Sequence, residues 1–139
     1  MRHPIDRFIS AFNGLKGSAN EQNLYSRFVR QHIDPFETVE EFGHWMARTP
    51  VNTSKVLSWL HFRPQYSWVT LDNKNVNLDE ILHFETLAKD WPIFAEKNGF
   101  PQDLPFIGKG RLRHNNIDSQ LNSFLRHVYR EDFDLFGYF

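Results

Sequence analysis

The sequence contains no cysteine, which excludes disulfide bonds, thiolate nucleophiles and zinc sites built on cysteine ligands. It also lacks an excess of either charge, since 16 lysine and arginine residues stand against 17 aspartate and glutamate residues. A protein that binds nucleic acid through a general basic surface needs a clear cationic excess, so that class is excluded. No run approaches the roughly 20 apolar residues of a membrane-spanning helix, and no signal-peptide pattern opens the chain. We therefore expect a protein of a reducing compartment, located in the cytoplasm.

Several catalytic motifs are missing as well. The sequence has no Walker loop, no Rossmann glycine fingerprint, no HExxH and no GxSxG. Its seven histidines are scattered, and none is followed by another at the third or fourth position, so we expect no metal site. What the chain does have is apolar side chains, which make up 40% of its 139 residues and include 14 phenylalanines. That supply is enough for one packed core, and we expect a single domain spanning residues 1–139.

The spacing of the apolar residues predicts a mostly helical chain. Ile5, Phe8, Ile9 and Phe12 lie on one face of a helix, and the preceding proline suits its first turn. Similar spacing predicts helices over 20–34, from 38, over 55–60, over 87–98 and from 119. Two other segments, 66–71 and 81–84, are rich in aromatic and β-branched residues and are predicted to be short strands. The expected fold class is therefore α/β, mostly helical with a few short strands.

The beginning of the chain has the composition of an anion site. Arg2 comes just before the first predicted helix, and Ser10 lies in its third turn, off the apolar stripe. A loop arginine at a helix N-terminus combines a fixed charge with free backbone N–H groups and the helix dipole. Its planar guanidinium also suits phosphate, because it forms bidentate hydrogen bonds. The alternative left open by the spacing is a frayed terminal Arg2 and an ordinary surface position for Ser10.

Four short blocks are spread in order over the chain. Residues 2–10 carry the pattern Arg-x-Pro-x-x-Arg-x-x-Ser, and residues 61–66 read His-Phe-Arg-Pro-Gln-Tyr. Residues 81–90 contain a Phe-Glu-Thr-Leu step, and residues 128–138 contain Tyr-x-x-Asp-Phe-x-x-Phe-x-Tyr. Together the blocks resemble the carbohydrate sulfotransferases of sulfotransferase family 2. These enzymes use 3′-phosphoadenosine 5′-phosphosulfate (PAPS) as the donor of a sulfuryl group for a sugar hydroxyl.

The resemblance implies roles for the basic residues that contact the cofactor. It assigns Arg2 and Ser10 to the 3′-phosphate of PAPS, with Arg7 as a supporting cation. Arg111 and Arg113 fall in a basic loop where related enzymes close over the nucleotide, so they are further cofactor-binding candidates. A solvated basic loop without a ligand is the alternative there.

The second block implies contacts with the acceptor glycan, and the third implies a structural contact. His61 is the candidate catalytic residue, as a proton acceptor, and Arg63 is the candidate partner for carboxylates or sulfates of the sugar. A structural His61 held by backbone groups is the alternative. Glu85 lies at the end of a predicted strand, where we expect it to tie the turn together.

The resemblance also implies a segment that this sequence does not contain. The family begins with a strand and a loop whose lysine or arginine holds the 5′-phosphosulfate, and nothing of this kind precedes Met1. Sulfuryl transfer depends on positioned cations, so we expect the chain to be inactive alone. The implied fold is then the later, mostly helical portion of a P-loop-like sulfotransferase domain, acting with a complementing N-terminal segment. The alternative is a non-catalytic binding or interaction module, which an exposed sheet edge would favour as a homodimer.

Overall fold

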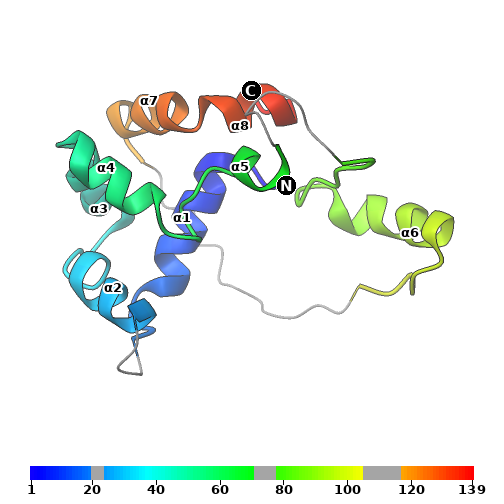
Figure 1. Ribbon diagram of the computed structural model, residues 1–139, viewed down its shortest axis with the longest axis horizontal. Coiled ribbons are helices and arrows are strands. Elements are labelled where there is room, and N and C mark those ends of the chain that lie inside the picture. Colours follow the sequence, from blue (N-terminus) through cyan, green and yellow to red (C-terminus); the bar gives the residue numbers. More distant parts are fainter. Residues whose placement is uncertain (20–23, 71–77, 105–116) are drawn as a thin grey trace.

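The computed structural model describes residues 1–19, 24–70, 78–104 and 117–139 (Figure 1). These residues form eight helices: α1 (Pro4–Leu15), α2 (Leu24–His32), α3 (Val39–Ala47), α4 (Pro50–Leu57), α5 (Tyr66–Val69), α6 (Leu87–Asn98), α7 (Ser119–Val128) and α8 (Arg130–Phe136). Within this described part of the chain, none of the helices has the length and apolar character needed to cross a membrane.

Local sequence explains where several of the helices begin and end. The Thr38 side chain accepts a hydrogen bond from the backbone N–H of Glu41, so one half of the predicted capping box starts α3. The Glu41 carboxylate accepts from the N–H of Glu37, one residue before the expected partner. Asp118 caps α7 in the same way, accepting from the N–H of Leu121 at 2.7 Å. At the end of α6, Gly99 takes up a left-handed conformation with φ of 73°, which glycine adopts without steric cost. These helix boundaries follow from side chains within a few residues.

The core lies where α1, α3 and α7 meet. The predicted apolar face of α1 is buried at Ile5, Phe8, Phe12 and Leu15, whereas Ile9 is only partly buried. Phe8 stacks on Phe42 with ring centroids 5.6 Å apart and meets Phe62 edge-on at 5.4 Å. Aromatic pairs in these arrangements add to the stabilisation that burial alone provides. The first helix is therefore fixed along most of its length, which holds its N-terminal end in place.

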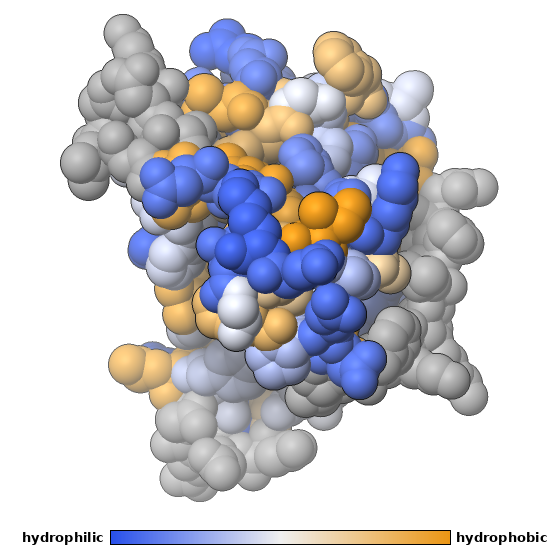
Figure 2. Space-filling view, turned by 90° about the vertical axis from the view of Figure 1, so that its right-hand side faces the viewer, coloured by the Kyte–Doolittle hydropathy of each residue, from blue (hydrophilic) through white to orange (hydrophobic). Residues whose placement is uncertain are grey.

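Helix α6 stands apart from this core (Figure 1). Ala95 is its one fully buried residue, and Ile93 on the same helix is 67% exposed. The molecular face on that side carries apolar surface only in small areas separated by hydrophilic side chains (Figure 2). The aromatic rings near this helix pack on one another instead, with Phe94 stacked on Phe100 at 6.0 Å.

The expected α/β fold class is wrong. Apart from an isolated bridge residue at Thr70, the described residues contain no strand and no sheet, so they do not form a P-loop-like α/β portion. Residues 66–69 form α5 because the Asp132 carboxylate accepts the backbone N–H groups of Gln65 and Tyr66 at 2.8 and 2.7 Å. Those are donors that the first turn of a helix leaves without partners. Hydrogen bonds from a residue far along the chain thus stabilise a helix in a segment whose composition indicated a strand.

The second predicted strand, 81–84, forms no regular element either. Its backbone contacts the first residue of the chain: the Met1 amino group donates to the Leu82 carbonyl, and the Phe84 N–H donates to the Met1 carbonyl at 2.6 Å. Two bonds on either side of one residue resemble a single rung of a parallel ladder. A sheet needs such pairing along several residues, which this pair of segments does not provide among the described residues.

Candidate functional site

The four sequence blocks meet around the first three residues of the chain. Gln65 holds both backbone groups of Arg2: the Arg2 N–H donates to Gln65 Oε1 at 3.0 Å, and Gln65 Nε2 donates to the Arg2 carbonyl at 2.7 Å. The N–H of His3 donates to Glu85 Oε1 at 2.6 Å. Arg2 is therefore anchored directly before α1, which does not fit the alternative of a frayed terminal residue.

The Arg2 side chain lies over an aromatic ring. Its guanidinium carbon is 4.8 Å from the centroid of the Phe84 ring, a cation–π arrangement. Among the described residues, no hydrogen-bond partner faces its guanidinium N–H groups. Ser10 is exposed on α1, off the buried stripe, as its spacing predicted. Within the described ranges, an arginine whose guanidinium has no hydrogen-bond partner thus precedes α1, and an exposed serine hydroxyl lies on that helix.

A buried carboxylate stands behind this arrangement. Asp132 is fully buried, and both of its oxygens accept backbone hydrogen bonds from the Gln65 block. Burial raises the pKa of Asp132, while these bonds and the nearby Arg7 charge act in the opposite direction. One turn earlier, the buried Tyr129 donates its hydroxyl to the Phe62 carbonyl at 2.7 Å. The fourth block therefore fixes the second block through two separate hydrogen-bonding groups.

Arg7 lies between these blocks. It is partly buried and donates from Nη2 to the Leu60 carbonyl at 3.2 Å. Burial lowers the pKa of Arg7, and the neighbouring Tyr129 and Asp132 raise it. Arg7 therefore lies beside a buried carboxylate, and the role of a structural or supporting cation stays a prediction.

His61 lies on the surface within reach of the Arg7 charge, and Arg63 follows it in a partly exposed position. Burial, with a further contribution from the Arg7 charge, lowers the pKa of His61 below its ordinary value. The residue is exposed overall, although its imidazole is partly covered, and the ring centroid lies 5.7 Å from that of Tyr25. The Arg63 guanidinium covers the half-exposed Trp68 ring at 5.1 Å. A neutral imidazole can accept a proton, and an arginine stacked on an aromatic ring can bind an anion.

Comparison with known families identifies what the four blocks have in common. The family model described as the sulfotransferase family matches residues 1–139. The chain belongs to the sulfotransferase family. No curated protein and no solved structure matches it. Membership supports a sulfotransferase-type function for this domain.

Sequence analysis identified some residues of this candidate site and missed others. Arg111 and Arg113 lie outside the described residues. Gln65 and Asp132 were not identified as site residues, although both belong to blocks that resemble the family. Their positions in those motifs are the signal that could have identified them. Glu85 ties more than its own turn, because it also accepts the Tyr138 hydroxyl at 3.1 Å. Burial acts to raise the pKa of Glu85, but hydrogen bonds from the backbone and from this hydroxyl outweigh it and lower the pKa.

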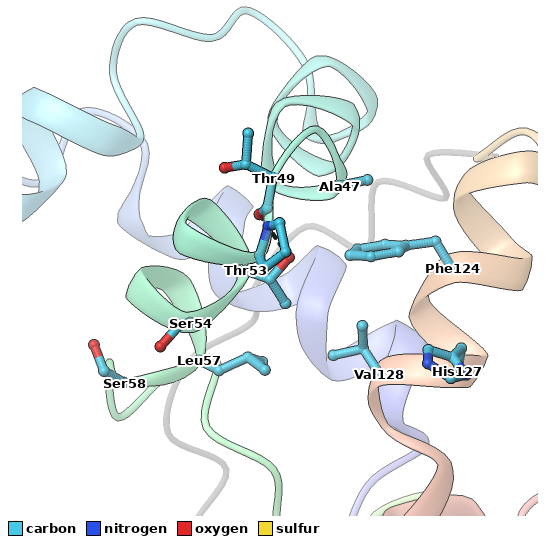
Figure 3. Close-up of a pocket in the computed structure, with 10 residues that line it drawn as sticks. Ala47, Thr49, Thr53, Ser54, Leu57, Ser58, Phe124, His127 and Val128 are labelled. Atoms are coloured by element: carbon cyan, nitrogen blue, oxygen red, sulfur yellow. Dashed lines mark hydrogen bonds between the residues drawn. The ribbon is translucent and has the colours of Figure 1, made fainter.

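Two other features could hold a ligand. A groove of about 750 Å³ lies between α4 and α7, where Leu57 faces Val128 and the Phe124 ring reaches across toward Thr53 (Figure 3). It shares no lining residue with the sulfotransferase blocks, apart from Val128. The second is a cluster of Glu40, His44 and Asp118, whose ligand atoms lie within 4.8 Å of one another.

That cluster has a structural explanation. His44 Nε2 lies 2.8 Å from Asp118 Oδ2, and the Asp118 N–H donates to Glu40 Oε1 at 3.0 Å. Since Asp118 also caps α7, each of the three side chains is used in joining α3 to α7. We assign no metal to it.

Proposed function

We propose that this chain carries the 3′-phosphate-binding part of a sulfotransferase that moves a sulfuryl group from PAPS to a carbohydrate hydroxyl. The observation that carries the proposal is the anchoring of Arg2 at the start of α1, with no partner for its guanidinium donors in the part of the chain that the structure describes. A planar guanidinium forms paired hydrogen bonds with phosphate. The positive end of the helix dipole, at the N-terminus of α1, also favours a negatively charged group. The exposed Ser10 hydroxyl adds a further donor on that helix. The residues present therefore fit a phosphate group.

The acceptor side of the proposal uses the second block. Bound PAPS supplies the sulfuryl group, whose bond to the 5′-phosphate breaks as the acceptor oxygen bonds to sulfur. His61 accepts the proton that the acceptor hydroxyl loses, a role that its lowered pKa supports by keeping the imidazole neutral at pH 7. Arg63 binds carboxylates or sulfates of the glycan. Neutralising the transferred group requires another positioned cation, which we propose a complementing N-terminal segment provides.

A calorimetric titration with 3′-phosphoadenosine 5′-phosphate (PAP), the desulfated cofactor, tests the proposal. We expect saturable binding that weakens on the order of 10- to 150-fold in Arg2→Ala, since a charged hydrogen-bonded pair contributes about 1.5–3 kcal/mol. Arg48→Ala is the matched control, because Arg48 is exposed at the end of α3 and far from the four blocks in sequence. Equal affinity in Arg2→Ala and Arg48→Ala would refute the assignment of Arg2.

The alternative function, a non-catalytic interaction module, is favoured by a different observation. Phe84, Ile93 and Phe100 are each more than half exposed on or near α6. A partner, such as a second copy of the chain, would cover these three side chains together with the hydrophilic residues between them. A folded chain that gives no heat with PAP but sediments as a concentration-dependent dimer would support the module instead of the transferase.

A further inference from the structure

We propose that Gln65 is a positioning residue that aims Arg2 at the phosphate, and that Asp132 holds Gln65 in place for this task. The inference rests on the proposed function, and it assigns a role to two residues that the first block does not contain. Neither residue touches the ligand in this proposal. Both act through the backbone of Arg2.

The first step is the geometry of the amide. A glutamine side chain has one acceptor and one donor group in the same plane, as a peptide unit does. Gln65 uses both on Arg2, at 3.0 Å to the N–H and 2.7 Å to the carbonyl. The contact imitates the pairing that a neighbouring strand would provide. It restricts the φ and ψ angles of Arg2 and therefore the direction in which the side chain leaves the backbone.

The second step is the rigidity of Gln65 itself. It is only 7% exposed, and its backbone N–H donates to Asp132 Oδ2 at 2.8 Å. The other Asp132 oxygen holds the N–H of Tyr66 at 2.7 Å, so the carboxylate grips two successive residues. A fully buried carboxylate bonded in this way has little freedom to move. The amide that contacts Arg2 therefore extends from a fixed point.

The third step is that different residues hold Met1, Arg2 and His3. Met1 is held by residues 82 and 84, and the His3 N–H is held by Glu85. Only Gln65, among the described residues, bonds both backbone groups of Arg2. Removing its amide would leave both ends of this short segment attached while freeing the residue in the middle. The cost would then fall on phosphate binding, because the ligand would have to order Arg2 itself.

A double-mutant cycle with PAP as the probe tests the inference. Gln65→Leu removes the amide at similar volume, and Gln31→Leu on the exposed face of α2 is the matched control. We expect Gln65→Leu to weaken PAP binding on the order of tenfold in the unaltered background. In the Arg2→Ala background the same substitution should have no further effect, because a positioning residue acts only through the residue it positions.

A second variant guards against misfolding. Gln65→Glu keeps the acceptor for the Arg2 N–H but loses the donor to its carbonyl while the carboxylate is ionised. Protonation restores a donor, so its PAP affinity relative to the unaltered chain should recover as the pH falls. Exchange of the Arg2 amide proton, measured by NMR without nucleotide, should be faster in both Gln65 variants.

The outcomes separate the two proposals. Weaker binding by Gln65→Leu to the same extent in both backgrounds would overturn the positioning role and leave the proposed function standing. If Gln65→Leu binds PAP as tightly as the unaltered chain, the positioning role is also overturned, whether or not the Arg2 amide proton exchanges faster. Absence of PAP binding by the unaltered chain would overturn the proposed function and the positioning role together. Coupling between positions 2 and 65, with normal behaviour of Gln31→Leu, supports both.

Discussion

The buried carboxylate of Asp132 should be a main determinant of stability. In Asp132→Ala, the backbone N–H groups of Gln65 and Tyr66 lose their acceptors in a buried or partly buried setting. An unsatisfied buried donor costs about 1–3 kcal/mol, and removing a buried charge offsets part of that loss. We therefore expect the free energy of unfolding to fall by about 2–4 kcal/mol. For a chain of this size, the melting temperature should drop by roughly 5–15 °C.

Urea unfolding followed by circular dichroism measures this loss directly. Asp132→Asn keeps the side-chain shape and one acceptor oxygen, so roughly half of the destabilisation should remain. Asp134→Ala is the control, because Asp134 lies on the same helix but is exposed, and we expect a change within about 0.5 kcal/mol. If Asp132→Ala unfolds at the same urea concentration as Asp134→Ala, the Asp132 carboxylate does not stabilise α5. The explanation given for this helix would then be incorrect.

Three further predictions follow from single contacts. The folded-state pKa of Glu85 lies below its ordinary value, so the stability that Glu85 contributes is present above the ordinary pKa and is lost as the pH falls through the folded-state pKa. The urea midpoint should therefore fall less in Glu85→Gln than in the unaltered chain when the pH is lowered from 6 to 3. Arg7→Met should raise the pKa of His61 in an NMR titration, and an unchanged value would mean that the Arg7 charge is not felt there. A Cβ atom on Gly43 would lie 2.6 Å from a leucine side chain of α7, so Gly43→Ala should lower the free energy of unfolding by about 1–3 kcal/mol. Gly14 has open space around it, so Gly14→Ala should be neutral or slightly stabilising. Thermal unfolding of both variants measures the difference.

Local patterns predicted most of the helices, because their signals are contained within a few turns. The apolar stripe of α1 and the capping box of α3 need no information from elsewhere in the chain. The strand predicted for 66–71 failed for the opposite reason. Aromatic and β-branched residues suit a strand and a partly buried helix alike, and the group that decides, Asp132, comes 66 residues after Tyr66.

The candidate site shows the same division between local and remote information. Sequence spacing alone could place Arg2 before a helix and Ser10 on its exposed face, because both positions follow from the period of α1. It could not show what holds Arg2, since Gln65 is 63 residues away and has no distinctive local pattern. The family resemblance pointed to the block that contains Gln65, but it did not distinguish a residue that binds from one that positions.

The candidate site is therefore formed by the contacts between blocks, and no single block forms it alone. The first block uses acceptors from the second and third, and the second block uses a carboxylate and a hydroxyl from the fourth. Each block taken alone would leave some of these groups without their partners. The series from Asp132 through Gln65 to Arg2 has three members, so a substitution at position 132 should change the behaviour of Arg2, the residue proposed to bind phosphate. That dependence separates an assembled nucleotide site from four coincidental motifs, because coincidental motifs would show no coupling between positions 132 and 2.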